Sequence, residues 1–323
     1  MNRIIKTGLL LPFITLIVLA TISYSFYGEL FLSFLPYAVG IYFIYMVVFT
    51  FLLFMNGADI KHANAYWVNW LVVFMIFLGI FSFYFDLSVN AEDNNSKPLK
   101  VVSANIWYKN TQTEEIQKFL ENENADIVML TEFTNDHFIA LQDYFDKNYD
   151  YQSMKIEDLS FPYTGKVVFS RYPLRDIKDS NHTFDELFLE NNVDIDGNSV
   201  ELVMVHTTAP VNENYFSSRN AQLEYFQSEI ITNLGNKALI TGDFNISPWS
   251  PRFLEMDRQL NSFEMNRVHT NEFDYTWKYH NNGFFKSHID HTYTSEGLSA
   301  TSFEYKEFPG SDHKAQVFTL VFE

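Results

Sequence analysis

Three long apolar segments near the N-terminus constrain the fold of this chain more than any other feature. They are Gly8 to Tyr27, Phe34 to Met55 and Tyr66 to Phe85, and none of them contains a charged residue. Each has about 20 residues, the length that a helix needs to cross ~30 Å of hydrocarbon. Core helices of a soluble protein are a poor alternative for three consecutive uncharged segments. We therefore predict three transmembrane helices within a membrane region over residues 1–88.

The first segment has a second interpretation. Arg3 and Lys6 precede it, as they would precede the apolar part of a cleaved signal peptide. Two further apolar segments come after it, however, and it is not succeeded by an evident small-x-small cleavage site. We therefore favour three retained helices.

The few charges around these segments predict an orientation. Arg3 and Lys6 favour a cytoplasmic N-terminus, Lys61 lies in the second loop, and the first loop contains Glu29 and no base. Three crossings then place everything after Asp86 outside the cytoplasm. The expected protein is a multi-pass protein of the cell (inner) membrane with an extracytoplasmic domain.

The remainder of the chain has a different composition. Residues up to Asp86 contain three bases and three acids, so the whole net charge of −18 belongs to residues 87–323. Residues 89–98 are polar and predict a linker, and residues 99–323 are sufficient for one domain with a sizeable core. Its acidic surface repels polyanions, so we expect no stable complex with nucleic acid. The absence of cysteine excludes disulfides, zinc–thiolate sites and a cysteine nucleophile.

Strand and helix patterns alternate through residues 99–323. Apolar runs predict strands at 99–104, 127–130, 166–170, 193–195, 200–205, 238–240, 276–278, 289–293 and 315–322, and helical spacing predicts helices at 113–123, 217–234 and 250–260. Strands interleaved with helices and followed by late antiparallel strands indicate a mixed α/β domain with a layered core.

Polar side chains follow several of these strands. In Leu239 to Pro248 (LITGDFNISP), Asp243 and Asn245 alternate with Phe244. Along an extended backbone the two polar side chains share a face, and Phe244 points into the protein. Glycine, Asp and Asn also punctuate turns, so this stretch alone fits a turn equally well. Glu132 comes directly after a fully apolar strand and is either a candidate metal ligand or an exposed strand end.

A lone histidine is usually structural, but His206 occupies the same position relative to its strand. It comes directly after the predicted strand 200–205, as Asn105, Glu132 and Asp243 come after theirs. We expect these strand-end side chains to converge on one rim of the domain.

Six short stretches, taken in order, resemble one family. They are SANIW with Asn105, VMLTEF with Glu132, VMVHTTAP with His206, TGDFN with Asp243 and Asn245, HIDHTY with Asp290, and GSDHK with Asp312 and His313. Together they resemble the endonuclease/exonuclease/phosphatase superfamily of Mg²⁺-dependent phosphoesterases, which includes DNase I. The resemblance covers residues 99–323, and the apolar N-terminal region is similar to that of membrane-anchored bacterial members.

The resemblance implies a DNase I-like four-layer α/β sandwich and a role for each of these residues. Glu132 would be the principal metal ligand, with Asn105 beside it and Asp312 as a further candidate ligand. Asp243 would orient or deprotonate the attacking water. Asn245 and His206 would hydrogen-bond the phosphate, and His313 would contact the scissile phosphate with its imidazole oriented by Asp290. Whether Asp243 or His313 is the base stays open, as does a count of one or two metals.

The chemistry of these residue types is consistent with that assignment. Hydrolysis of a phosphoester requires a hard cation, an activated water and donors for the developing charge. Oxygen ligands with few imidazoles suit Mg²⁺, or Mn²⁺, better than Zn²⁺. Arg171 and Arg219 carry the positive charge that a contact with phosphate needs. We nevertheless favour structural ion pairs as the role of both.

We therefore expect a membrane-tethered, Mg²⁺-dependent phosphoesterase. Its substrate would be a phosphodiester or phosphomonoester in a lipid headgroup, a nucleotide or a nucleic acid fragment. An extracytoplasmic nuclease is the alternative within the same class. A catalytically inactive, membrane-anchored binding or sensing module is the alternative from another class.

Overall fold

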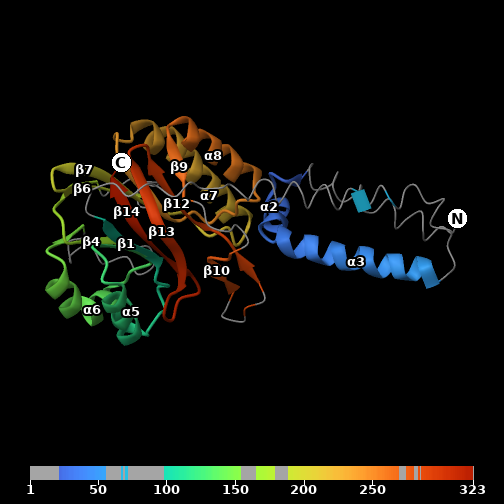
Figure 1. Cartoon of the computed structure of the whole chain (residues 1–323), viewed down its shortest axis with the longest axis horizontal. Helices are drawn as coiled ribbons and strands as arrows, with labels where there is room; N and C mark the ends of the chain where they lie inside the picture. The colour runs from blue at the N-terminus through green and yellow to red at the C-terminus, as the bar shows by residue number, and fades with distance from the viewer. Residues whose placement is uncertain are drawn as a thin grey trace.

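The computed structural model describes residues 22–55, 67, 70–71, 98–153, 165–178, 188–268, 274–279, 283 and 285–322. Within these residues, two six-stranded sheets form the centre of a domain, and one long helix, α3, projects away from it (Figure 1).

The first sheet has the strand order β13-β14-β1-β2-β4-β3. Its strands are β1 (Leu99–Asn105), β2 (Ile127–Thr131), β3 (Tyr151–Gln152), β4 (Lys166–Ser170), β13 (Leu298–Glu307) and β14 (Lys314–Phe322). Only β1 and β2 pair in parallel, and helix α5 (Thr113–Glu123) connects them. The second helix of this half is α6 (Asn135–Asn148).

The second sheet repeats this plan with the order β5-β6-β7-β8-β12-β9. Its strands are β5 (Leu174–Lys178), β6 (Phe188–Ile195), β7 (Asn198–His206), β8 (Ala238–Asp243), β9 (Met265–Arg267) and β12 (Asp290–Ser295). Its one parallel pair is β7 with β8, connected by α7 (Glu213–Tyr225), and α8 (Pro251–Ser262) comes after β8. A separate two-stranded hairpin consists of β10 (Trp277–Lys278) and β11 (Lys286–Ser287).

Alternating side chains build four layers from these elements. In β1, Val102 and Ala104 pack in a core with α5 and α6, whereas Leu99 and Val101 pack against the second sheet with Leu202 and Leu239. A third core joins the outer face of the second sheet to α7 and α8. The helix–sheet–sheet–helix arrangement confirms the predicted α/β sandwich, and its sheets are mixed.

Two helices differ from the sequence-based expectation. Helix α6 was not predicted, although Thr134 caps it and His137 completes a reciprocal capping box. The helix expected at 217–234 begins earlier, after the N-cap Asn212, and α7 then passes into a π-helical turn at Phe226–Ile230. Side-chain periodicity cannot distinguish such a turn from a regular helix.

Helix α3 (Leu35–Met55) coincides with the second predicted membrane segment. Its window 35–52 has a mean hydropathy of 1.9, and it is the one helix of the described residues that is long and apolar enough to cross a membrane. The expectation of three such helices is thus supported for one. The first predicted segment, 8–27, is described only from Ile22, and there a turn with the N-cap Ser25 precedes a new helix at Phe26, so the predicted helix does not continue to Tyr27. The segment 66–85 is described only at residues 67, 70 and 71, and the linker 89–98 only at residue 98.

Residues expected to form a loop before α3 instead form a short helix that docks on the domain. Helix α2 (Phe26–Ser33) starts at the N-cap Ser25. Its Phe26 packs edge-on against Phe216 of α7, with ring centroids 5.8 Å apart, and Glu29 forms a buried ion pair with Arg219 of α7. Glu29 is therefore buried rather than solvent-exposed, because Arg219 neutralises its charge.

Candidate active site

The ends of the central strands bring the predicted polar residues to one rim. The parallel pair β1–β2 places Asn105 opposite Thr131, the residue before Glu132. The parallel pair β7–β8 places His206 opposite Asp243. Asp290 begins β12 directly opposite Asp243 in the antiparallel register. His313 precedes β14 in the other sheet and forms an isolated bridge with Trp277.

Asn105, Glu132 and His206 form the first group, which we call the Glu132 cluster. Asn105 Nδ2 donates to Glu132 Oε1 over 2.9 Å, and His206 Nε2 lies 3.5 Å from the same oxygen. The backbone N–H of Tyr108 donates to Glu132 Oε2 over 3.0 Å. These contacts hold Glu132 at a φ of 56°, a left-handed conformation that is uncommon for this residue type.

The Glu132 cluster keeps its carboxylate ionised. Burial alone would raise the pKa of Glu132, but the hydrogen bond and charge of His206, with the donors of Tyr108 and Asn105, lower it to about 2. An anionic oxygen therefore persists at this strand end at any physiological pH.

Asp243, Asp290 and His313 form the second group, which we call the Asp243 cluster. His313 Nδ1 and Asp290 Oδ2 are hydrogen-bonded at 3.0 Å, and His313 Nε2 lies 3.7 Å from Asp243 Oδ2. All three side chains are buried. Asn105 Nδ2 lies 3.3 Å from Asp243 Oδ2, so one amide joins the two clusters.

Protonation in the Asp243 cluster differs from that in the Glu132 cluster. Burial raises the pKa of Asp243 to about 7, and the nearby charge of Asp290 adds to this effect. Burial alone would lower the pKa of His313, but the carboxylates of Asp290 and Asp243 outweigh it and raise the pKa to about 10. The two carboxylates therefore favour the charged form of His313, whereas burial favours the protonated form of Asp243.

The loop after Asp243 is fixed from several sides. Asp243 Oδ1 accepts from the N–H of Asn245 over 2.8 Å, and Asn245 Nδ2 donates to the carbonyl of Thr207 over 2.8 Å. Phe244 is fully buried, as the alternation predicted. Gly242 has a φ of +139°, and a side chain there would collide with the carbonyl of Val205 on β7. Only glycine permits this close approach of the two parallel strands.

The residues 102–313 match the model of the endonuclease/exonuclease/phosphatase family, which is more than half of the chain. The chain belongs to the endonuclease/exonuclease/phosphatase family.

Solved structures share the family fold at low sequence identity. An endonuclease/exonuclease/phosphatase from Beutenbergia cavernae DSM 12333 has a TM-score of 0.54 and 17% identity over 70% of this chain and 72% of that one. The 3′ phosphatase NExo from Neisseria, bound to a product DNA hairpin, has a TM-score of 0.52 and 19% identity over 70% and 99%. A mutant of beta toxin from Staphylococcus aureus with bound magnesium ions has a TM-score of 0.50 and 18% identity over 70% and 100%. No match was found among curated protein sequences.

Two arginines of this family member form structural ion pairs, as the sequence favoured. Arg171 Nη1 lies 3.1 Å from Asp126 Oδ1. Arg219 is fully buried between Glu29 and the Asp243 loop, and its Nη1 donates to the carbonyl of Asn245 over 2.9 Å.

Asp312 stands apart from the other candidate residues of this family member. Its Oδ2 accepts from the indole Nε1 of Trp277 over 3.0 Å, and its carbonyl accepts from the N–H of Lys278. No contact between its carboxylate and either cluster is present within the described residues. Its role as a metal ligand stays a prediction.

Several supporting residues of this family member were not identified from sequence. Ser311 Oγ donates to the carbonyl of Asn105 over 2.7 Å and accepts from the N–H of His313 over 3.0 Å, so it joins the connection between β13 and β14 to the end of β1 within the first sheet. Thr207 Oγ1 donates to the carbonyl of Phe244 over 2.6 Å. Both are neighbours of predicted site residues in the sequence, which is the one signal that could have found them.

Glu132 supplies carboxylate oxygens of the kind that hold a hard cation. Asn105 Nδ2 is within 3.3 Å of both the Glu132 and Asp243 carboxylates, so negative oxygens gather around a single amide. A hard cation bound by oxygen ligands compensates such a concentration of charge. Asp243, Asp290 and His313 also offer ligand atoms within 4.8 Å of one another, and a hydrogen bond between His313 and Asp290 joins two of them.

Proposed function

We propose that this chain is a membrane-tethered, Mg²⁺-dependent phosphoesterase that hydrolyses its substrate by attack of water. The observation that carries the proposal is the proximity of an ionised carboxylate, Glu132, to a carboxylate of near-neutral pKa, Asp243, and an imidazolium, His313. Paired groups whose pKa values are moved apart by their surroundings are typical of acid–base catalysis.

We assign the base role to Asp243. A general base is most effective when its pKa is close to the working pH, and burial brings that of Asp243 to about 7. His313 carries its proton at that pH and would donate a hydrogen bond to a phosphoryl oxygen. Asp290, bonded to His313 Nδ1, orients the ring and stabilises its charge.

Glu132 would hold the ion, with Asn105 beside it. When bound, Mg²⁺ would polarise a phosphoryl oxygen and offset the charge that develops on it. Asn245 and His206 would hydrogen-bond the phosphate from the same rim. The alternative of an inactive binding module is disfavoured because it gives no reason for the unusual backbone of Glu132 or for a buried Asp–His–Asp arrangement.

The placement of this domain outside the cytoplasm rests on the charge distribution around the apolar segments and stays part of the proposal. Helix α3 supports tethering by its length and apolar surface, on which Ile41 and Phe51 are 69% and 60% exposed. A protease that digests the domain only from the cytoplasmic side would contradict this orientation.

The activity test requires the full chain in detergent or lipid. A fragment without α2 would leave Arg219 buried without its ionic partner Glu29. We expect hydrolysis of bis-p-nitrophenyl phosphate with MgCl₂ or MnCl₂, loss of activity with EDTA and recovery when Mg²⁺ is restored. Metal-independent hydrolysis, or no hydrolysis by a folded protein, would contradict the proposal.

A further inference from the structure

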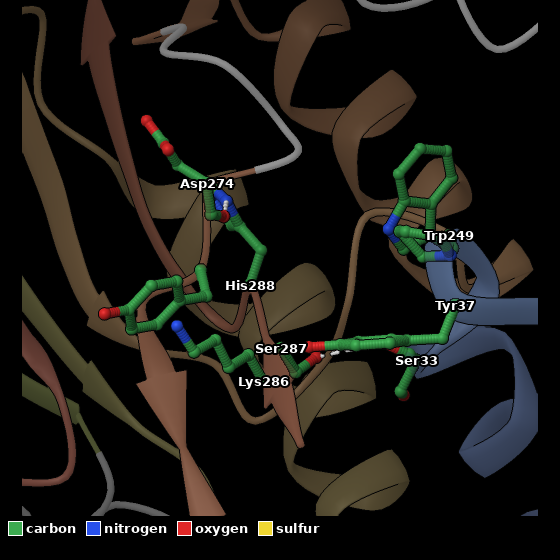
Figure 2. Close-up of a pocket in the computed structure, with 9 residues that line it drawn as sticks. Ser33, Tyr37, Trp249, Asp274, Lys286, Ser287 and His288 are labelled. Atoms are coloured by element: carbon green, nitrogen blue, oxygen red, sulfur yellow. Dashed lines mark hydrogen bonds between the residues drawn. The ribbon is translucent and has the colours of Figure 1, made fainter. Parts of the chain in front are cut away.

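A cavity of about 260 Å³ lies where the membrane helix meets the catalytic domain. Tyr37 of α3 and Trp249 lie on one side of it, and Asp274 with Lys286 lies on the other (Figure 2). This cavity, which we call the α3 cavity, thus combines residues of the predicted membrane region with residues of the phosphoesterase domain.

The walls of the α3 cavity are continuous with the segments that hold the catalytic groups. Trp249 belongs to the loop that starts at Asp243. His288 lies two positions before Asp290, and Thr276 Oγ1 accepts from the N–H of Asp290 over 3.0 Å. Trp277, next in sequence, bridges to His313. The cavity is therefore lined by the same segments that carry Asp243 and Asp290.

The lining combines one cation with several aromatic rings. Lys286 Nζ lies 3.8 Å from the centre of the Tyr275 ring, and none of the ion pairs among the described residues involves Lys286. His288 has both ring nitrogens occupied, by the carbonyl of Asp274 and the hydroxyl of Tyr305. Lys286 is thus a charged donor of the lining, and Tyr37 and Trp249 add aromatic surface, so the cavity suits a ligand with hydrogen-bond acceptors at one end and apolar chains at the other.

The cavity lies at the N-terminal end of α3, next to the exposed apolar surface of this helix. Tyr37 lies in the first turn of this helix, and Ile41, one turn later, is 69% exposed. Phe34 and Phe285 pack edge-on at 5.7 Å and hold the start of α3 against the β10–β11 hairpin. A bilayer that surrounds α3 would therefore meet the protein at this cavity, whereas the net charge of −18 disfavours a polyanionic nucleic acid there.

We propose that the α3 cavity is the substrate subsite for a phosphoester lipid drawn from the bilayer. The phosphate would reach the Asp243 and Glu132 clusters. The polar region next to it would lie between Tyr37 and Lys286, and the acyl chains would run along α3. This assignment rests on the phosphoesterase activity proposed above, and it names the substrate class of that same site.

The test compares two substrates on the full chain reconstituted in vesicles of phosphatidylcholine, phosphatidylethanolamine and phosphatidylglycerol in equal parts. Release of headgroup from the vesicles is measured by mass spectrometry, and hydrolysis of bis-p-nitrophenyl phosphate is measured on the same preparation. Tyr37→Ala and Lys286→Ala are each expected to lower the lipid rate relative to the bis-p-nitrophenyl phosphate rate by roughly 10–100-fold, the usual range for lost pocket contacts. Lys286→Arg, which keeps the cation, should restore most of the ratio.

Ile139→Ala, a comparably exposed apolar residue of α6 that does not line the cavity, is the matched control and should leave the ratio unchanged. Equal losses on both substrates, no loss on either, or a protein that cleaves bis-p-nitrophenyl phosphate but none of the lipids would overturn the lipid subsite alone. Failure on both substrates would overturn the phosphoesterase proposal and the subsite with it.

Discussion

Glu132 and Asp243 are chemically similar carboxylates at neighbouring strand ends, yet their surroundings give them opposite properties. Glu132 receives a backbone N–H, an amide and a nearby histidine, and its pKa falls to about 2. Asp243 is buried beside a second carboxylate, Asp290, and its pKa rises to about 7. The number of donors and the depth of burial, rather than residue type, thus separate a candidate ligand from a candidate base.

The largest effect is expected from removing the proposed base. Asp243→Asn keeps the shape and the hydrogen bond to Asn245 but cannot accept a proton at neutral pH. We expect kcat to fall by about 10³–10⁴-fold, the upper part of the range for general-base catalysis. Steady-state hydrolysis of bis-p-nitrophenyl phosphate provides the measurement. Asp146→Asn, on the exposed side of α6, is the control and should have the kcat of the wild type. A wild-type kcat in Asp243→Asn would contradict the assignment of Asp243 as the base.

The second test asks whether the Glu132 cluster acts through a metal. Glu132→Gln removes the charge but leaves a side chain that the Tyr108 N–H can still reach. We expect Mg²⁺ or Mn²⁺ to bind at least roughly 100-fold more weakly, the upper end for losing even an outer partner of a metal ligand. Added metal should partly restore activity. Calorimetry with Mn²⁺ separates the clusters, because Asp243→Asn should change affinity less; equal affinities in Glu132→Gln and wild type would contradict the ligand role.

The third test concerns the charge of His313. Asp290→Asn removes the carboxylate that does most to raise the pKa of this imidazole. A raised pKa keeps the ring protonated up to a higher pH, so its loss should move the alkaline limb of the kcat profile to lower pH and reduce the maximum by roughly 10–100-fold. Asp312→Asn, which removes a weaker contributor, should shift the same limb less. An unchanged limb in Asp290→Asn would show that His313 does not titrate there.

The sequence could predict the rim because its cause is local. A fully apolar run such as Ile127 to Leu130 predicts a buried strand, and the polar residue after it must lie at the strand end. The separation of pKa values could not be predicted, because it depends on the Tyr108 N–H and on complete burial of Asp243. The loop assigned to Glu29 was wrong for a related reason, since its partner Arg219 is 190 positions away.

The smallest effect on activity is expected from breaking the ion pair between Glu29 and Arg219. This change should affect the Asp243 cluster and not the Glu132 cluster. Arg219 supports the carbonyl of Asn245, whose N–H binds Asp243, but it makes no contact with Glu132 within the described residues. Glu29→Gln leaves the buried guanidinium without an ionic partner, which should destabilise the protein by about 1–3 kcal/mol and lower its Tm in detergent. We expect kcat to fall less than about 10-fold, with metal affinity unchanged, because only the Asp243 loop loses support. Glu255→Gln, at the exposed hydrogen bond from Tyr24, is the control and should change the Tm little. A loss of metal affinity in Glu29→Gln equal to that in Glu132→Gln would mean that the two clusters are not independent.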